Sequence, residues 1–281
     1  ICFALAVSAA AAERTVDPTW LYRFAPAAKE QPSDVTTPSC HYKPLFGAGD
    51  SEARIVKGVA RYGEIVVDPN GVCASVNYPA EEQVYVILAG SGMLTHGAVQ
   101  APVRKHDFLY LPPGVPHAVA NASSEPLRLM VMGFRIPPET KIAAPAKFQS
   151  ANIDDVKLQT VGGHPPTTLY RLLMGDTTST RDRIAAGHVL TSLFIMEFAP
   201  GGTNFPHHHE TEEEIYLLLD GHGEMVAGAG MDGAEGRHPA KLGDAYFFRL
   251  NCTVGFYAST EPGTKARILA VRSRFPFAKR P

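Results

Sequence analysis

The sequence predicts an all-β protein built from two similar halves, and three observations support this prediction. The chain has 281 residues, which at roughly 100–200 residues per domain suggests two domains. Its 25 glycines and 23 prolines require frequent turns, which favours many short strands over long helices. The third observation is an internal repeat, in which segments of the second half match segments of the first.

The chain opens on a run of apolar and small residues, 1–12, before the first charged residue, Glu13. A short apolar run that ends in small residues is typical of a secretory signal peptide, and alanine has a poor preference for strands. We therefore expect residues 1–12 to be the remnant of a signal peptide and the protein to be secreted or periplasmic. An apolar first strand is the alternative. Residues 13–54 are expected to form an N-terminal arm.

The cysteines fit an exported protein without identifying the disulfide. If Cys2 leaves with the signal peptide, Cys40, Cys73 and Cys252 remain. Three cysteines allow one disulfide and one spare thiol, and the sequence does not choose the pair. No Cys-x-x-Cys pattern occurs, which argues against thiolate zinc sites and redox dithiols.

The repeat places matching strands in the two halves. The apolar and β-branched runs 83–88 and 214–219 match at an offset of 131 residues, and each is followed by Gly-x-Gly, which suits a tight turn. Residues 107–111 match 244–248 at an offset of 137, so the second copy has a loop longer by six residues, which we assign to 228–233. Each half is therefore one copy of a unit of roughly 100 residues.

The overall charge excludes several classes of partner. The net charge of −2 offers no general attraction to nucleic acid or to an anionic membrane, and no window has the 18 or so apolar residues of a membrane span. The basic stretch 272–280 is interpreted as a solvated tail. We expect a small-molecule substrate or ligand as the partner, and formation of a homo-oligomer stays open.

The segment from Gly201 to Glu214 contains three consecutive histidines followed by a run of acidic residues. In an extended chain alternate side chains share a face, so His207 and His209 point together and His208 points away. Glu214 opens the next predicted strand and can return a carboxylate to the two imidazoles. Two histidines and one carboxylate can hold one divalent transition metal (Fe, Mn, Cu, Ni or Zn) with coordination positions left open. The alternative is a surface loop rich in histidine and glutamate.

These residues resemble the motifs of the cupin superfamily. The first motif, G-x5-H-x-H-x3–4-E-x6-G, is matched in the second half by Gly201, His207, His209, Glu214 and Gly221. The second motif, G-x5-P-x-G-x2-H-x3-N, is matched in the first half by Pro112, Gly114, His117 and Asn121. The resemblance implies a bicupin: two tandem cupin domains, each a small antiparallel jelly-roll β-barrel, over 55–136 and 151–281, joined by a linker over 137–150.

The first half departs from the metal-binding pattern of this family. Val76, Tyr78 and Gln83 stand where two histidines and a glutamate are expected, and His117 alone is kept. We therefore expect a degenerate N-terminal site, marked by Gln83 and His117, that holds no metal. In the second half Val254 replaces the last histidine, so the metal there would have two histidines and one glutamate as ligands.

Other residues near the second site are candidates for contact with a substrate. Arg249 stands where the family has a proline, and it could bind a carboxylate or a sugar acid; a salt bridge at the rim is the alternative. Tyr257 could complete the metal site, and Tyr246 could line the mouth of the pocket. Glu212 and Glu213 are interpreted as a solvated face, although one of them could act as a base outside the ligand set.

The resemblance and the open coordination positions favour a secreted metal-dependent enzyme, an oxidoreductase of the dioxygenase type that acts on a small phenolic or sugar-derived molecule. Catalytic residues other than the ligands are not identified. One alternative is a redox-neutral isomerase, lyase or hydrolase that uses the same metal to polarise a carbonyl. The other is a non-catalytic bicupin that binds a small ligand, because a fold does not fix a function.

Overall fold

The structure of the chain is a computed structural model that describes residues 19–276 except 52, 144, 146 and 229–234. The predicted signal peptide and nearly all of the predicted longer loop lie outside the described residues. Within the described part, the helices are three short 3-10 turns, η1 (Ala25–Ala27), η2 (Ala53–Ile55) and η3 (Ile153–Asp155). None of the described helices is long and apolar enough to cross a membrane.

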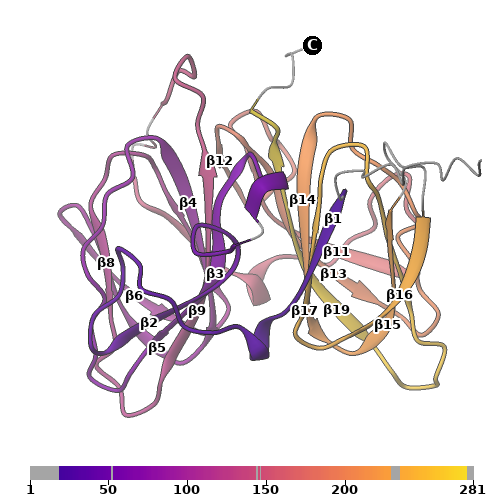
Figure 1. Ribbon diagram of the computed structural model, residues 1–281, viewed down its shortest axis with the longest axis horizontal. Helices are drawn as coiled ribbons and strands as arrows, with labels where there is room; N and C mark the ends of the chain where they lie inside the picture. Colours follow the sequence, from indigo (N-terminus) through magenta and orange to yellow (C-terminus); the bar gives the residue numbers. More distant parts are fainter. Residues whose placement is uncertain (1–18, 52, 144, 146, 229–234, 277–281) are drawn as a thin grey trace, which may run out of the picture.

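Two β-barrels lie side by side, and each pairs one large sheet with one three-stranded sheet (Figure 1). The all-β prediction with two tandem barrels is confirmed. In the first barrel the sheets have the orders β10-β7-β4-β9-β3-β2 and β6-β5-β8. The bounds of these strands are β2 (Cys40–Gly47), β3 (Val59–Val67), β4 (Glu81–Ala89), β5 (Ser91–His96), β6 (Val99–Arg104), β7 (Asp107–Leu111), β8 (His117–Ala120), β9 (Leu127–Arg135) and β10 (Gln149–Asn152).

The second barrel repeats this arrangement with one further strand, at the edge of its large sheet. Its sheets have the orders β1-β17-β14-β19-β13-β11-β12 and β16-β15-β18. The bounds are β1 (Trp20–Phe24), β11 (Thr168–Asp176), β12 (Ile184–Gly187), β13 (Leu190–Phe198), β14 (Glu212–Asp220), β15 (His222–Gly228), β16 (Glu235–Lys241), β17 (Asp244–Phe248), β18 (Thr253–Ala258) and β19 (Ala266–Arg274). The matching strands of the repeat, β4 with β14 and β7 with β17, occupy the same places in the two barrels.

Three hydrophobic clusters hold the molecule together. One fills the interior of each barrel, and the third lies between the two large sheets, where residues of both barrels pack together. Phe46 of the first barrel and Phe247 of the second meet there, with ring centroids 5.9 Å apart. The strands of the large sheets are therefore buried on both faces, which explains why the runs 83–88 and 214–219 are almost continuously apolar instead of alternating.

The residues expected as an N-terminal arm belong to both barrels. β1 pairs with β17 of the second barrel, and β2 pairs with β3 of the first. In Figure 1 the indigo strand β1 accordingly lies among the orange and yellow strands of the second barrel. β10, at the end of the predicted linker, pairs with β7 of the first barrel. Strand exchange thus links the two halves more closely than the repeat alone suggests.

Two buried glutamates, one from each barrel, accept hydrogen bonds from the backbone of the other barrel. The carboxylate of Glu82 accepts hydrogen bonds from the backbone N–H groups of residues 188–190, at 2.8, 2.9 and 2.5 Å. Glu213, 131 residues later, accepts from the N–H groups of residues 57–59 at 2.8, 2.7 and 3.1 Å. The interpretation of Glu213 as part of a solvated face is therefore wrong, since its strand lies between the barrels and its side chain is buried.

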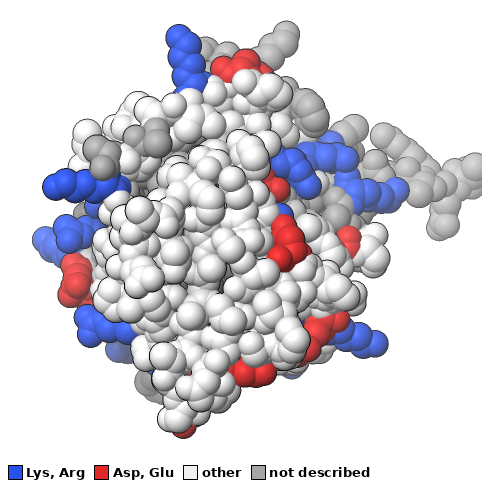
Figure 2. Space-filling model, turned by 90° about the vertical axis from the view of Figure 1, so that its left-hand side faces the viewer, with Lys and Arg blue, Asp and Glu red and all other residues white. Residues whose placement is uncertain are grey.

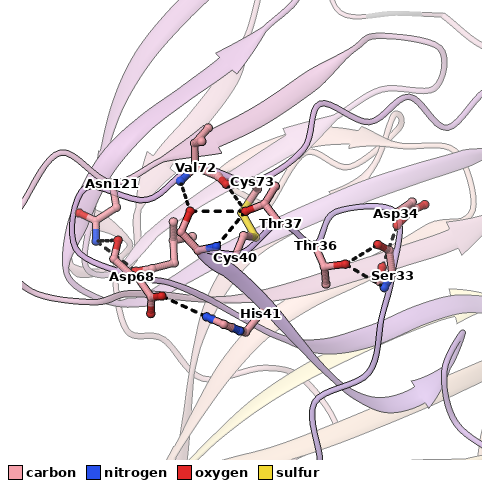
Figure 3. The surroundings of a disulfide bond; sticks show 12 residues. Ser33, Asp34, Thr36, Thr37, Cys40, His41, Asp68, Val72, Cys73 and Asn121 are labelled. Atoms are coloured by element: carbon pink, nitrogen blue, oxygen red, sulfur yellow. Dashed lines mark hydrogen bonds and ion pairs between the residues drawn. A yellow bond between two sulfur atoms is a disulfide. The ribbon is translucent and has the colours of Figure 1, made fainter.

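The disulfide joins Cys40 of β2 to Cys73, in the loop before β4, and Cys252 lies buried outside this bond. Figure 3 shows the polar contacts that surround the bond. The Thr37 hydroxyl donates to the carbonyl oxygen of Val72 at 2.6 Å. The Asn121 amide donates to the carbonyl oxygens of residues 67, 68 and 125. The disulfide and these hydrogen bonds therefore fix the loop between β3 and β4 of the first barrel.

Candidate metal centre

The three predicted ligands converge inside the second barrel. One ligand atom each of His207, His209 and Glu214 lies within 4.8 Å of the others. An isolated bridge holds the segment extended, because the N–H of His207 donates to the Val254 carbonyl at 2.9 Å and the reverse bond measures 2.8 Å. Alternation then turns His208 outward, where it is exposed, and leaves its two neighbours facing the barrel.

Two of the converging atoms are buried and lack further hydrogen bonds. Nε2 of His209 and Oε2 of Glu214 face each other as an ion pair at 3.2 Å, and neither atom has a further hydrogen-bond partner among the described residues. A buried polar atom without a partner is costly, and most such atoms in proteins are satisfied. A divalent ion between these atoms would satisfy both, so the residues fit a metal of the kind that imidazole and carboxylate ligands bind.

The surroundings also favour the metal-binding ionisation states of His207 and Glu214. Burial lowers the pKa of His207, which favours the neutral imidazole. Its Nδ1–H donates to the Phe205 carbonyl at 2.8 Å, which leaves Nε2 with a lone pair. Burial alone would raise the pKa of the Glu214 carboxyl, but the nearby His209 and Arg272 outweigh it and lower that pKa, so the carboxylate is ionised.

Backbone strain marks the turn before the first ligand. Phe205 has a φ of 54°, in the left-handed region that bulky residues rarely adopt, and its side chain is 52% exposed. The strained turn directs the Phe205 carbonyl at the His207 ring. Strain of this kind costs on the order of 1–3 kcal/mol and is concentrated at functional sites.

A cavity of about 90 Å³ opens beside the three ligands. Its wall combines aromatic and aliphatic side chains with a similar share of polar and charged ones. The lining residues include Val161, His164, Tyr170, Ser192, Phe194, Met196, Asn204, Tyr216 and Arg272. The hydroxyl groups of Tyr170 and Ser192 are buried and have no hydrogen-bond partner in the described structure. The cavity therefore offers both apolar contact and unused polar groups to a small molecule.

Two arginines, Arg181 and Arg272, line this cavity, and Arg272 lies next to the predicted ligands. Its Nη1 lies 3.4 Å from Glu212 Oε2, and its Nε lies 4.0 Å from Glu214 Oε1. That Nε atom is buried without a hydrogen-bond partner among the described residues. Glu212 Oε2 also lies 3.6 Å from Nδ1 of His209, and Nη1 of Arg272 lies 3.4 Å from the same nitrogen. The interpretation of residue 272 as the start of a solvated tail is wrong, because it belongs to β19 and faces the barrel interior.

The three residues predicted to contact a substrate do not line the cavity. Arg249 lies in the turn after β17, where its backbone N–H donates to the Thr19 carbonyl. Tyr257 faces outward on β18, with the Arg237 guanidinium 4.0 Å from its ring centroid. Tyr246 packs in the core, where its ring stacks on Phe248. The residues on either side of Tyr257 point inward, so strand alternation turns Tyr257 away from the ligands.

The degenerate site of the first barrel is filled by protein. His117 lies at the matching place, bridged to Val76, and its Nε2 lies 3.1 Å from the Tyr85 hydroxyl. The amide of Gln83 donates to Glu81 at 2.7 Å. Burial lowers the pKa of His117, as expected for a neutral histidine held in a protein core.

A buried arginine occupies the centre of this first interior. Arg61 lies with its guanidinium 4.0 Å from the ring centroid of Tyr78, and it bonds Asp34 at 2.9 Å and Glu81 at 3.2 Å. Gly133 makes room for it, since a Cβ there would come within 2.7 Å of Arg61. Sequence reasoning missed both Arg61 and Arg272. Both arginines lie on strands that are far in sequence from Gln83 and Glu214. Strand alternation alone therefore does not identify them, because the pairing of the strands must also be known.

Comparisons with known proteins agree with this architecture. A family model described as "Cupin domain" matches residues 63–133, within the first barrel. An uncharacterized protein from Methanocaldococcus jannaschii is 31% identical over 81 residues, which are 28% of this chain and 65% of that protein. The match therefore spans slightly less than two thirds of that relative.

Solved structures match over nearly the whole chain at low identity. The protein YlbA from E. coli aligns with a TM-score of 0.69 and 14% identity, over 96% of this chain and 97% of that one. A Bacillus subtilis oxalate decarboxylase variant has a TM-score of 0.65 and 11% identity, over 94% and 79% of the two chains. Vicilin from hazelnut, Corylus avellana, has a TM-score of 0.62 and 12% identity, over 92% and 88%. The first barrel therefore contains a cupin domain, and the chain as a whole has the two-barrel fold of these bicupin structures.

Proposed function

We propose that the second barrel binds one divalent transition metal through His207, His209 and Glu214 and that the protein is a metal-dependent enzyme. The observation that supports this most strongly is the pair of buried atoms without further hydrogen bonds, His209 Nε2 and Glu214 Oε2, 3.2 Å apart. The cavity beside them combines apolar surface with a few converging polar groups, as sites that bind small molecules do. A surface loop rich in histidine and glutamate would not bury these atoms.

The reaction we favour is oxidative. Two histidines and one carboxylate form the ligand set that non-haem iron oxygenases use, with open positions for oxygen and substrate. When bound, the metal would supply Lewis acidity and a place for these two reactants. The chain's own residues would exclude water through the apolar side chains of the wall and hold the substrate through Arg272. A dioxygenase-like oxidoreductase is thus our first candidate.

The cavity narrows the class of substrate. A cavity of about 150 Å³ is known to hold a benzene ring, and the one here measures about 90 Å³. Arg272 presents a guanidinium that can bind a carboxylate by two parallel hydrogen bonds. Ser192 adds an unused hydroxyl beside it. We therefore favour a small carboxylic acid, including acids derived from sugars, over a phenol.

A redox-neutral reaction on such an acid is the second candidate. Glu212 lies outside the ligand set with a side chain only 17% exposed, next to His209 and Arg272. A carboxylate in that position can accept or return a proton while the metal polarises the substrate. A similar fold occurs in the oxalate decarboxylase of Bacillus subtilis, for which Mn(II) centres are described. Oxygen uptake during turnover of a candidate acid supports the first reaction, and turnover without uptake supports the second.

Both candidate reactions require a metal ion at His207, His209 and Glu214, and the metal content of the purified protein tests this requirement. We expect about one transition-metal ion per chain, and a His207→Ala/His209→Ala variant should lose it while keeping its β-sheet circular dichroism. His208→Ala is the matched control, because His208 is exposed and points away from the cavity. Unchanged metal content in the double variant would refute the site. Metal binding without turnover of any acid would favour a non-catalytic binding protein.

We further propose that the protein works in an oxidising compartment, outside the cell or in the periplasm. The support is the Cys40–Cys73 disulfide, a bond that persists in such compartments and is rare in the cytosol. Fractionation of cells that make the protein, followed by thiol labelling of each fraction, would test this. A protein recovered from the cytosol with both thiols labelled would contradict it.

A further inference from the structure

A second cavity, of about 740 Å³, lies between the two barrels and away from the candidate metal centre. Both barrels supply its walls, and η1 and η3, which lie between the barrels in Figure 1, contribute to them. None of its lining residues lines the cavity beside the ligands. Its volume falls within the roughly 300–1,000 Å³ typical of sites that bind small molecules.

The walls of this interbarrel cavity are mainly apolar. Val86 and Met130 of the first barrel face it, together with Leu217 and Leu219 of the second. At its edge, Leu242 is 57% exposed, the highest value among the large apolar side chains that the structure describes. Apolar surface left uncovered in a cavity lowers its free energy when a ligand removes it from water, by about 25 cal/mol per Å². The cavity therefore suits a ligand with an apolar body.

The charged residues around the cavity are mostly basic. They are Lys43, Lys105, Arg128 and Arg267 against the two carboxylates Glu64 and Asp220. Arg128 pairs with Glu64, whose side chain is only 9% exposed. Lys43 and Lys105 have no ion-pair partner among the described residues, so their charges are available to a ligand. The buried Nε of Arg267 also lacks a hydrogen bond in the described structure, and its nearest carboxylate oxygen, on Glu197, is 3.8 Å away.

We propose that the interbarrel cavity binds an amphipathic anion, a carboxylate with an apolar tail. The tail would lie against the leucine and valine side chains, and the carboxylate would meet the excess of positive charge at the edge. An amphipathic cation of the same size would meet that charge with repulsion. Charge complementarity of this kind decides which ligands an apolar cavity accepts.

Isothermal titration calorimetry of the full chain with decanoate, below its micellar concentration, tests this proposal. We expect one decanoate per chain, and decyltrimethylammonium, which has the same tail and the opposite charge, should bind at least about tenfold more weakly. Absence of decanoate binding, or equal binding of the two probes, would overturn the proposal. The metal plays no part in the measurement, so its outcome is independent of the proposed enzymatic function.

Two variants locate the binding. Lys105→Glu and Leu242→Asp change exposed positions at the cavity, and each should weaken decanoate binding at least about tenfold. Lys141→Glu makes the same charge change at an exposed residue outside the lining, and we expect it to alter binding by less than about twofold. Equal affinities of Lys105→Glu, Leu242→Asp and wild type would show that decanoate binds elsewhere and would refute the assignment.

Discussion

The interiors of the two barrels differ by the exchange of one arginine between neighbouring strands. In the first barrel Arg61 on β3 pairs in register with Gly133 on β9. In the second, Ser192 on β13 pairs with Arg272 on β19, at the corresponding place. Each of these two register positions therefore holds one arginine and one small partner, in opposite order. The exchange shows that the barrel tolerates a buried cation on either strand and that the partners of the cation determine its role.

The partners of the two arginines are different. Arg61 bonds Asp34, Glu81 and the Tyr78 hydroxyl at 2.9–3.2 Å, so the interior of the first barrel is electrostatically satisfied. Arg272 has no carboxylate oxygen closer than 3.4 Å. A satisfied ion cluster stabilises a fold, whereas an unsatisfied one keeps its capacity to bind. We infer that the first barrel is a scaffold for the second.

The outer faces of the two barrels also differ in the charged residues that they carry. Figure 2, which shows the first barrel end-on, has a broad central area without charged residues. On β5 and β6 of this barrel, Met93 and Val99 are 37% and 43% exposed. The corresponding sheet of the second barrel has the exposed ion pair Arg237–Glu224. Charge is thus distributed unequally over the two copies, outside as well as inside.

Removal of the buried guanidinium should have the largest effect on stability. Arg61→Ala leaves Asp34 and Glu81 without their cation, so we expect the free energy of unfolding to fall by about 3–5 kcal/mol. Arg272→Ala should cost under about 2 kcal/mol, because its ion pairs are longer. Urea denaturation followed by circular dichroism measures both. Equal losses in the two variants would contradict the assignment of a scaffold role to the first barrel alone.

Reduction of the disulfide should have the next largest effect. Cys40 and Cys73 are 33 residues apart, and closing a loop of that length in the unfolded chain stabilises the folded state by about 3–4 kcal/mol. We expect a Cys40→Ala/Cys73→Ala variant to lose this amount in denaturation experiments. Cys252→Ala, in the second barrel, is the comparison and should lose under about 2 kcal/mol. A smaller loss in the double variant would show that the hydrogen bonds around the loop suffice.

The two glutamates between the barrels, Glu82 and Glu213, should each stabilise the folded protein by a similar amount. Glu82→Gln and Glu213→Gln each replace a carboxylate that accepts three backbone N–H bonds by an amide with one acceptor oxygen. We expect each to lower the free energy of unfolding by about 2 kcal/mol. Glu212→Gln, beside Glu213 but partly exposed, should change it by under about 1 kcal/mol. Unequal losses at positions 82 and 213 would show that the two contacts are not energetically equivalent.

The smallest expected effect concerns pH. Burial lowers the pKa of His117 in the folded chain below its ordinary value of 6.5, so between these two pKa values the unfolded chain binds more protons. Stability should therefore fall as the pH drops, and His117 contributes at most about 0.7 kcal/mol between pH 7 and pH 6. His117→Gln should reduce this loss and His208→Gln should not. An unchanged pH dependence in His117→Gln would mean that His117 stays accessible to protons.

The repeat in the sequence predicted the duplicated barrels because the matching strands are followed by matching turns in both copies. Gly90 and Gly221 illustrate this, since both have positive φ, and a Cβ there would come within 2.6 and 2.1 Å of backbone oxygens. The strand β1 takes the place in the second barrel that β10 takes in the first, but neither strand lies in the segments that match in sequence, so the pairing of β1 could not be predicted. The burial of Glu213 was missed for a related reason, because only the packing of two barrels covers both faces of β14.

Within the candidate site, local spacing sufficed for the residues that are close in sequence. His207, His209 and Glu214 lie within eight residues: alternation puts the two histidines on one face, and Glu214 follows at the start of β14. Arg272 reaches the cavity through the pairing of β19 with β13 and β14, which local spacing does not reveal. Arg249 was favoured instead because the family has a proline at its position. A motif within one segment therefore predicts candidate ligands in that segment. It does not predict charged residues, such as Arg272, that reach the cavity from a distant strand.

The exchange of β1 into the second barrel and the paired contacts of Glu82 and Glu213 make the covalent connection between the halves nearly redundant. A protease that cut the chain between residues 137 and 148 would leave two fragments that stay bound to each other, because each fragment completes the other. Neither half would form a self-sufficient unit if produced alone. Selection would therefore keep both copies, because each is needed for the other to fold. One copy can then lose its metal-binding residues and still be retained.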